Sequence, residues 1–164
     1  MPRMQVELVP AARDQLPVID NLIQLYAHDF SEFQEIQLDA NGRFQYTPLP
    51  LYWTEPTHHP FLVKADGKLA GFVLVKQEAG VWDMAEFFIV RGCRRHGIGT
   101  TVAHQVWRRF PGPWEVRVME ANQGAVAFWE RAISKFIGAP VKSKRVAKNG
   151  KLWHHFGFDS APAV

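Results

Sequence analysis

Residues 87–101 read FFIVRGCRRHGIGTT, and three local signals meet in them. The apolar run 87–90 is typical of a buried strand. A basic turn follows, and a helical pattern begins at once with Ile98. A strand that turns this tightly into a helix directs consecutive backbone N–H groups at one point, where the positive end of the helix dipole adds to them. We therefore predict an anion site, above all for phosphate, where Gly97 and Gly99 let oxygens approach the backbone.

The spacing of the glycines separates the candidate ligands. A dinucleotide-binding turn requires GxGxxG and a nucleoside triphosphate loop requires a lysine after its last glycine, and this stretch has neither. It does have RxxGxG, at Arg94, Gly97 and Gly99. This resembles the acetyl-coenzyme A signature of the GCN5-related N-acetyltransferase (GNAT) superfamily, in which Arg or Gln precedes GxG or GxA. A tight strand-to-helix turn without a ligand is the alternative.

The sequence after the turn supports this resemblance. Apolar residues recur at helical spacing from Ile98 to Phe110, and the prolines of residues 111–113 end that helix. Residues 114–119 alternate as a strand, and Asn122 can cap a further helix. From Asn122 the chain reads NQGAVAFW, similar to the NxxAxxF[YF] pattern of the superfamily. The resemblance covers about residues 84–136, and elsewhere it depends on the order of the elements.

The rest of the chain reads as further helices and hairpins. We predict a first helix capped by Asp14, with Pro17 in its first turn, and a short helix near residues 38–46. Turns at residues 66–67 and 149–150 predict two hairpins. The predicted strands are 61–65, 69–75, 81–90, 141–147 and 152–158. The resemblance implies an α+β (mixed α/β) acyl-CoA N-acyltransferase fold. Its twisted sheet is mixed but mostly antiparallel, has helices on both faces, and contains two parallel strands, 84–90 and 114–119, that splay apart to admit the pantetheine arm.

Length and composition suit one globular domain. The chain has 164 residues, 47% of them hydrophobic, enough for a single domain over 1–164 with a sizeable core. No apolar run is long enough to span a bilayer, and residues 1–4 do not begin a signal peptide. A single cysteine, Cys93, excludes an internal disulfide and suits a reducing compartment. We therefore expect a cytoplasmic protein with no membrane partner.

The charge pattern bears on other partners. The net charge of +3 is mild, although basic residues gather at 91–95, 108–109 and 142–148. Nucleic-acid binding through these segments is an alternative that so small a net charge supports poorly. The sequence is compatible with a monomer or a homodimer.

Glu86 is the candidate general base. It interrupts an otherwise apolar strand, where a bare carboxylate is costly unless it is paired or functional. Members of the superfamily often carry a glutamate on this strand that takes the amine proton, whereas an ion pair with a nearby Arg or Lys is the alternative. The resemblance also implies that a backbone N–H near Ile89 or Val90, where the strand bulges, stabilises the oxyanion.

Trp129 departs from the family pattern. A tyrosine often stands at this position and protonates the leaving thiolate, and an indole N–H is no useful acid. We interpret Trp129 as packing, or as a wall beside the coenzyme. The thiolate could leave unaided, or take a proton from water or from Tyr26, Tyr46 or Tyr52.

The resemblance implies a coenzyme site at the end of the strand, in the turn and in the two helices that follow. Its expected residues are Phe88, Ile89, Val90, Arg94, Arg95, His96, Gly97, Ile98, Gly99, Thr100, Asn122 and Trp129. Asn122 could bind the coenzyme or only cap its helix.

The acceptor site should lie among the first helices, residues 30–60 and the last hairpin. Aromatic residues there suggest a partly apolar pocket, and Glu32, Glu35, Asp39 and Glu55 could attract a cationic amine. The histidine pairs 58–59 and 154–155 lack the spacing of metal ligands, so we expect no metal, although the second pair could border the acceptor.

These patterns together predict an acetyl-CoA-dependent N-acetyltransferase. We expect the acetyl group to pass from acetyl-CoA, as co-substrate, to a primary amine by direct attack in a ternary complex. The acceptor would be a small-molecule amine or a protein amino group, which the residues do not identify. The alternative function is a non-catalytic acyl-CoA-binding sensor module.

Overall fold

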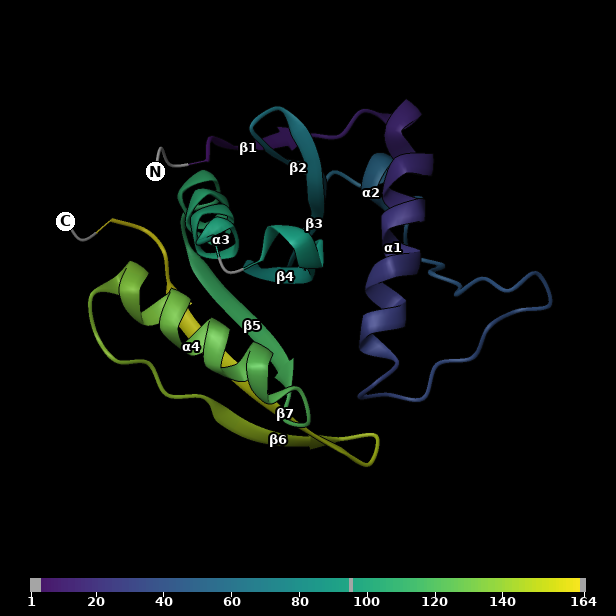
Figure 1. Ribbon diagram of the computed structural model, residues 1–164. Helices are drawn as coiled ribbons and strands as arrows, with labels where there is room; N and C mark the ends of the chain where they lie inside the picture. The colour runs from purple at the N-terminus through teal and green to yellow at the C-terminus, as the bar shows by residue number, and fades with distance from the viewer. Residues whose placement is uncertain (1–3, 95, 163–164) are drawn as a thin grey trace.

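The sheet of this protein lies between α1 and α2 on one face and α3 and α4 on the other (Figure 1). A computed structural model describes residues 4–94 and 96–162. The helices are α1 (Leu16–Phe30), α2 (Leu51–Thr54), α3 (Ile98–Arg109) and α4 (Gln123–Ile137), with 3-10 turns η1 (Arg13–Gln15) and η2 (Arg91–Cys93). The strands are β1 (Val6–Pro10), β2 (His58–Ala65), β3 (Lys68–Glu78), β4 (Val81–Ile89), β5 (Pro113–Met119), β6 (Lys144–Lys148) and β7 (Lys151–Asp159).

The topology confirms the predicted mixed fold. The strands lie in the order β1-β2-β3-β4-β5-β7-β6, and every neighbouring pair is antiparallel except β4 and β5, which are parallel. Both predicted hairpins are present, and their turn residues 66–67 and 149–150 have positive φ angles, as tight two-residue turns require. Strand β1 was not predicted, because it has only five residues and ends in Pro10, which weakens the strand signal.

Apolar side chains divide between the two faces of the sheet. Residues of β3 alternate: Val73 and Val75 pack under α3 and α4, whereas Phe72 and Leu74 pack under α1 and α2. This alternation follows from the two-residue period of a strand and gives a covered sheet with a core on each side. Among the described residues, no helix is both long and apolar enough to cross a membrane.

Two predictions in the first third of the chain were wrong. Residues 38–46 form an irregular segment, in which Asp39 binds the backbone N–H groups of Asn41 and Arg43 instead of starting a helix. Asp14 lies inside η1 and does not cap α1, which begins after Gln15 without a side-chain cap. Figure 1 shows that the segment between α1 and α2 extends away from the sheet.

Strands β4 and β5 separate after a short shared stretch. They pair only at Trp82 with Trp114 and at Asp83 with Glu115, and beyond these residues they diverge. In the same part of β4 a bulge makes Ala85 the extra residue, because Leu74 of β3 faces Glu86 while Val75 faces Met84. The predicted splay is thus confirmed, but the bulge lies at Ala85 and not at Ile89 or Val90.

Gly71 of β3 lets β4 approach closely where it pairs with Ile89. A Cβ on Gly71 would lie 2.0 Å from the backbone oxygen of Phe88. We expect Gly71→Ala to lower the free energy of unfolding by about 3 kcal/mol or more, since backbone must move to relieve the clash. The matched control is Gly157→Ala in β7, where no atom lies within 4 Å of the added Cβ. Urea unfolding of both variants measures the difference, and equal stabilities would contradict this packing.

Candidate functional site

A cleft with a volume of about 1280 Å³ opens where β4 and β5 diverge. Its walls come from α1, residues 31–46, β4, β5, the turn before α3, and α4. Nine of the predicted site residues line it: Glu86, Phe88, Ile89, Arg94, Gly97, Gly99, Thr100, Asn122 and Trp129. Residues that are far apart in the sequence therefore meet in one cleft.

Three predicted coenzyme residues that the structure describes do not belong to that lining. Val90, His96 and Ile98 are described by the structure and lie outside it. The Ile98 side chain is buried in the core beneath α3, His96 is exposed to solvent, and Val90 packs on the side of α1. Arg95 falls outside the described residues.

The start of α3 presents to the cleft backbone N–H groups that have no acceptor within the helix. The first helical hydrogen bond runs from the Thr101 N–H to the Gly97 oxygen at 3.1 Å, so the N–H groups of Ile98, Gly99 and Thr100 have no acceptor within the helix. No side chain caps this end, and no acidic residue lies in the first turn. The positive end of α3 is therefore available to an anion.

Local structure explains both glycines of the motif in a way that the sequence did not reveal. Gly97 is the N-cap of α3 with φ of 73°, a left-handed conformation that favours glycine. A Cβ on Gly99 would lie 3.1 Å from the Phe128 ring, so this glycine lets α3 and α4 pack closely. Close approach of a phosphate is a further use of the same positions and stays a prediction.

The backbone of β4 turns polar groups toward the gap. The Val90 N–H donates to the Ala70 oxygen at 2.8 Å, which removes Val90 from the two positions, Ile89 and Val90, predicted for the oxyanion donor. Because hydrogen-bonded positions alternate along an antiparallel pair, Ile89 turns its N–H and C=O away from β3. The Ile89 oxygen accepts a hydrogen bond from Arg94 Nε at 2.8 Å. The N–H of Ile89 thus stays a candidate oxyanion donor.

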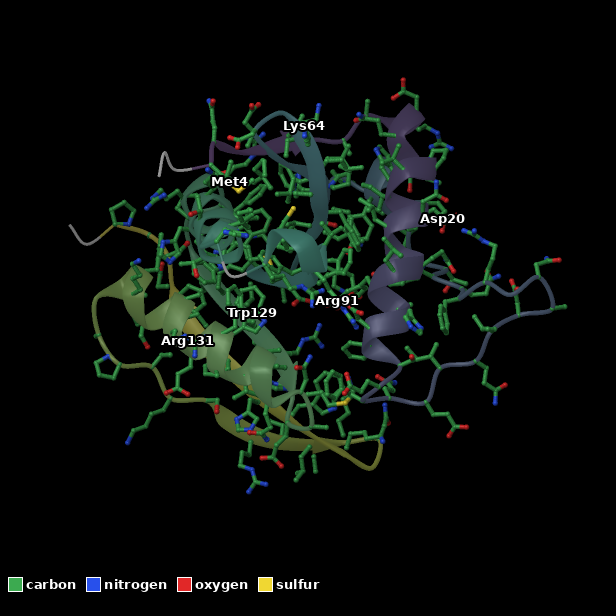
Figure 2. All side chains as sticks on the ribbon, viewed as in Figure 1. Met4, Asp20, Lys64, Arg91, Trp129 and Arg131 are labelled. Atoms are coloured by element: carbon green, nitrogen blue, oxygen red, sulfur yellow. The ribbon has the colours of Figure 1, made fainter. Side chains whose placement is uncertain are left out.

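Arg94 connects the turn to α1, which the sequence did not predict. Its guanidinium contacts Asp29 near the end of α1 at 2.8 Å, and Arg91 contacts the other oxygen of Asp29 at 2.5 Å. Burial alone would raise the pKa of Asp29, but hydrogen bonds from Arg94 and Arg91 outweigh burial and leave that pKa below its ordinary value. Figure 2 shows Arg91 between this turn and α1. The Arg94 side chain therefore orders the turn.

Glu86 lies on the α1 face of the sheet, beside Tyr26, Tyr46 and Tyr52. Burial raises the pKa of its carboxyl group, while the hydroxyls of Tyr26 and Tyr46 interact with the carboxylate and lower that pKa in part. Burial likewise raises the pKa of all three phenols, and the Glu86 charge raises it further. A carboxylate with a raised pKa can act as a base. Phenols that keep their protons can donate hydrogen bonds to it.

An ion pair next to Glu86 was missed in the sequence. Arg117 of β5 contacts Asp83 of β4 at 2.6 Å, at the point where the two strands separate. In a regular strand Asp83 and Glu86 would face opposite sides, but the bulge at Ala85 turns both toward α1. Burial raises the pKa of Asp83, against the opposing effect of Arg117. A register shift of this kind leaves no signal in residue spacing.

Trp129 of α4 lines the cleft (Figure 2), and so does Asn122, the N-cap of the same helix. The Trp129 side chain is buried and packs edge-on against the Phe87 ring, with 4.9 Å between ring centroids, which fits its interpretation as a wall. Asn122 accepts a hydrogen bond from the Ala125 N–H at 3.1 Å, so its capping role is confirmed. A contact of Asn122 with the coenzyme stays a prediction.

The predicted acceptor region contributes only in part. Glu32 and Glu35 line the cleft together with the aromatic residues Phe30, Phe33, Phe44 and Tyr46, whereas Asp39, Tyr52, Trp53 and Glu55 do not line it. Neither His154 nor His155 borders the cleft. His154 instead binds Ser143 and Glu120, and His155 lies 3.3 Å from Glu115. In the described part of the chain, no three His, Cys, Asp or Glu side chains gather as metal ligands.

Comparisons with known proteins agree with this geometry. The sequence has no match among curated proteins. Solved structures that resemble it in fold include an acetyltransferase from Thermus thermophilus, with a TM-score of 0.71 and 15% identity over 97% of this chain and 99% of that chain. A spermidine N-acetyltransferase from Vibrio cholerae in complex with CoA and spermine has a TM-score of 0.66 and 16% identity over 95% of this chain and 96% of that chain. A ribosomal-protein alanine N-acetyltransferase from Escherichia coli has a TM-score of 0.61 and 12% identity over 98% of this chain and 97% of that chain. The sequence model of the acetyltransferase (GNAT) family matches residues 19–133, and the chain therefore belongs to the GNAT family of acetyltransferases.

Proposed function

We propose that this protein transfers the acetyl group of acetyl-CoA, the co-substrate of its family, to a primary amine by direct attack in a ternary complex. The supporting observation is a single cleft with unpaired helix amides at one end and the Glu86 carboxylate at the other. The gap between β4 and β5 joins the two ends. Because one sheet carries both ends of the cleft, we take residues 1–164 as one domain.

The coenzyme half would hold acetyl-CoA through backbone groups. The pyrophosphate fits the N–H groups of Ile98, Gly99 and Thr100, where the helix dipole favours negative charge. The amides of pantetheine would lie in the gap between β4 and β5, where backbone groups have no partner in the neighbouring strand. Trp129 would form the opposite wall.

The chemistry requires a neutral amine, a donor for the oxyanion and an acceptor for one proton. The amine nitrogen attacks the thioester carbonyl carbon, and the Ile89 N–H stabilises the charge that develops on the carbonyl oxygen. The new C–N bond forms as the C–S bond breaks, and the amine proton passes to Glu86, directly or through a water molecule. The products are an acetamide and the coenzyme thiolate.

Departure of the thiolate does not require Trp129. A thiolate is a weak base compared with an amine and leaves without full protonation. Burial and the Glu86 charge raise the pKa of Tyr26 and Tyr46, so these phenols are weak acids, and water is the better proton source for the thiolate. A sensor that only binds acyl-CoA would need the helix amides but not a buried carboxylate beside two phenols, so Glu86 favours an enzyme.

We expect Glu86→Gln to lower the turnover number by about 10²- to 10⁴-fold, because the amide cannot take a proton. In the wild-type protein the rate should fall as the pH drops through the pKa of Glu86, which lies above the 4.5 of an ordinary glutamate. The variant should lose that limb of the pH–rate profile and bind coenzyme A unchanged in calorimetry. The control is Glu78→Gln, an exposed glutamate outside the cleft. A variant with full turnover and the wild-type profile would exclude Glu86 as the base.

We expect Gly97→Glu to weaken coenzyme A binding at least 100-fold, since it adds a carboxylate where the helix amides should meet phosphate. The matched control is Gly42→Glu, because Gly42 has almost the same φ angle, 74°, and lies outside the cleft. Isothermal titration calorimetry with coenzyme A compares the two variants. Equal affinities would move the pyrophosphate site away from this turn.

A further inference from the structure

The Asp83–Arg117 ion pair lies on the floor of the acceptor half, next to Glu86. The Arg117 side chain is 40% exposed and lines the cleft, whereas the Asp83 side chain is only 14% exposed. Arginine has five N–H donors in a planar fork, and the contact at 2.6 Å from Nη2 to the Asp83 Oδ2 uses one of them. The pair thus fixes the guanidinium while its remaining edge is accessible from the cleft.

We propose that the acceptor is a free α-amino acid with a large apolar side chain, whose carboxylate is bound by Arg117. The inference rests on the proposed acetyl transfer and specifies its substrate. The amine of such an acceptor would meet Glu86 and Asp83, and its carboxylate would meet the accessible edge of Arg117 in a bidentate contact. An amino acid carries its ammonium group and its carboxylate on one carbon, so it can meet acidic and basic side chains that are neighbours, as Asp83 and Arg117 are.

The position of Arg117 disfavours two other classes of amine. A diamine would bring a second positive charge toward the Arg117 guanidinium, which is repulsive. A protein N-terminus has an amide where the amino acid has its carboxylate, so it would leave the Arg117 edge without a charged partner. Glu32 and Glu35 also line the cleft and, like Arg117, are exposed, so they can attract the ammonium group of an amino acid as well as a second amine.

The apolar part of the lining indicates the side chain of the acceptor. Apolar residues from several elements line this cleft. They are Phe30 at the end of α1, Phe33 and Phe44 on the irregular segment, Met119 on β5 and Trp153 on β7. Burial of apolar surface among them is favourable in proportion to area, so a large side chain gains more than a small one.

A matched series of acceptors tests the carboxylate contact. L-phenylalanine, L-phenylalaninamide and 2-phenylethylamine share one amine and one ring and differ only in the group on the α carbon. With acetyl-CoA as donor, thiol release gives the rates and mass spectrometry identifies the acetylated products. We expect kcat/KM for L-phenylalanine to exceed that for the amide by about tenfold or more. Amine basicity alone would not produce this preference. The amide has the less basic amine, so a larger fraction of it is uncharged and able to attack at a given pH.

Two substitutions separate recognition from structure. Arg117→Gln should reduce the preference of acid over amide at least tenfold, mainly through a higher KM for L-phenylalanine, and Arg117→Lys should restore part of it. The control Arg13→Gln makes the same chemical change on an exposed residue outside the cleft and should keep the wild-type preference. The ratio between acceptors is the decisive measurement, because a general loss of stability lowers all three rates together.

Three results would overturn this inference. They are equal rates for acid and amide, a faster reaction with 1,4-diaminobutane than with L-phenylalanine, and an Arg117→Gln variant that lowers all three rates by the same factor. In the last case Arg117 only holds β4 and β5 together. Acetylation of the diamine alone would contradict the amino-acid acceptor and leave the acetyltransferase function standing, whereas no thiol release with any amine would contradict both.

Discussion

The divergence of β4 and β5 is the constraint on which the other features depend. Two parallel strands that share only the pairs Trp82–Trp114 and Asp83–Glu115 leave backbone groups without partners beyond that point. An unpaired buried N–H or C=O is costly, so a gap of this kind is stable only where side chains, water or a ligand satisfy it. Arg94 does so for the carbonyl of Ile89, and the Arg117–Asp83 pair spans the start of the gap. The opening lets residues of α1 and residues of α3 and α4 line one cleft, in which we place the proposed coenzyme and acceptor halves.

The bulge at Ala85 has an effect of similar importance. Without the extra residue, the β4 side chains beyond it would exchange faces, and Glu86 would point toward α3 and α4. With the extra residue, Asp83 and Glu86 both face α1. There Tyr26 lies beside the half-buried carboxylate of Glu86. The same environment raises the pKa of Glu86, which brings a carboxyl group nearer to the pH at which a base is effective.

Much of this could be predicted from local sequence, because local signals have local causes. The turn at residues 91–97, the cap at Asn122 and the hairpin turns at 66–67 and 149–150 all formed as predicted. What failed depends on contacts between distant segments. The Asp29–Arg94 and Asp83–Arg117 pairs join residues that are 65 and 34 positions apart, and no spacing rule connects them. Val90 was misassigned because its N–H belongs to the β3 ladder, which only the register reveals.

The irregular segment between α1 and α2 stands apart from the sheet and still supplies Phe33, Phe44 and Tyr46 to the cleft (Figure 1). Its residues take no part in the strand pairing that keeps β4 and β5 in place. Leu49 and Tyr46 pack in the core on the α1 side, but substitutions and changes of length elsewhere in the segment cost the scaffold little, as is usual for surface loops. Natural selection can therefore retune which molecule is modified while the machinery that handles the donor stays intact, and homologues of this chain should diverge first in this segment.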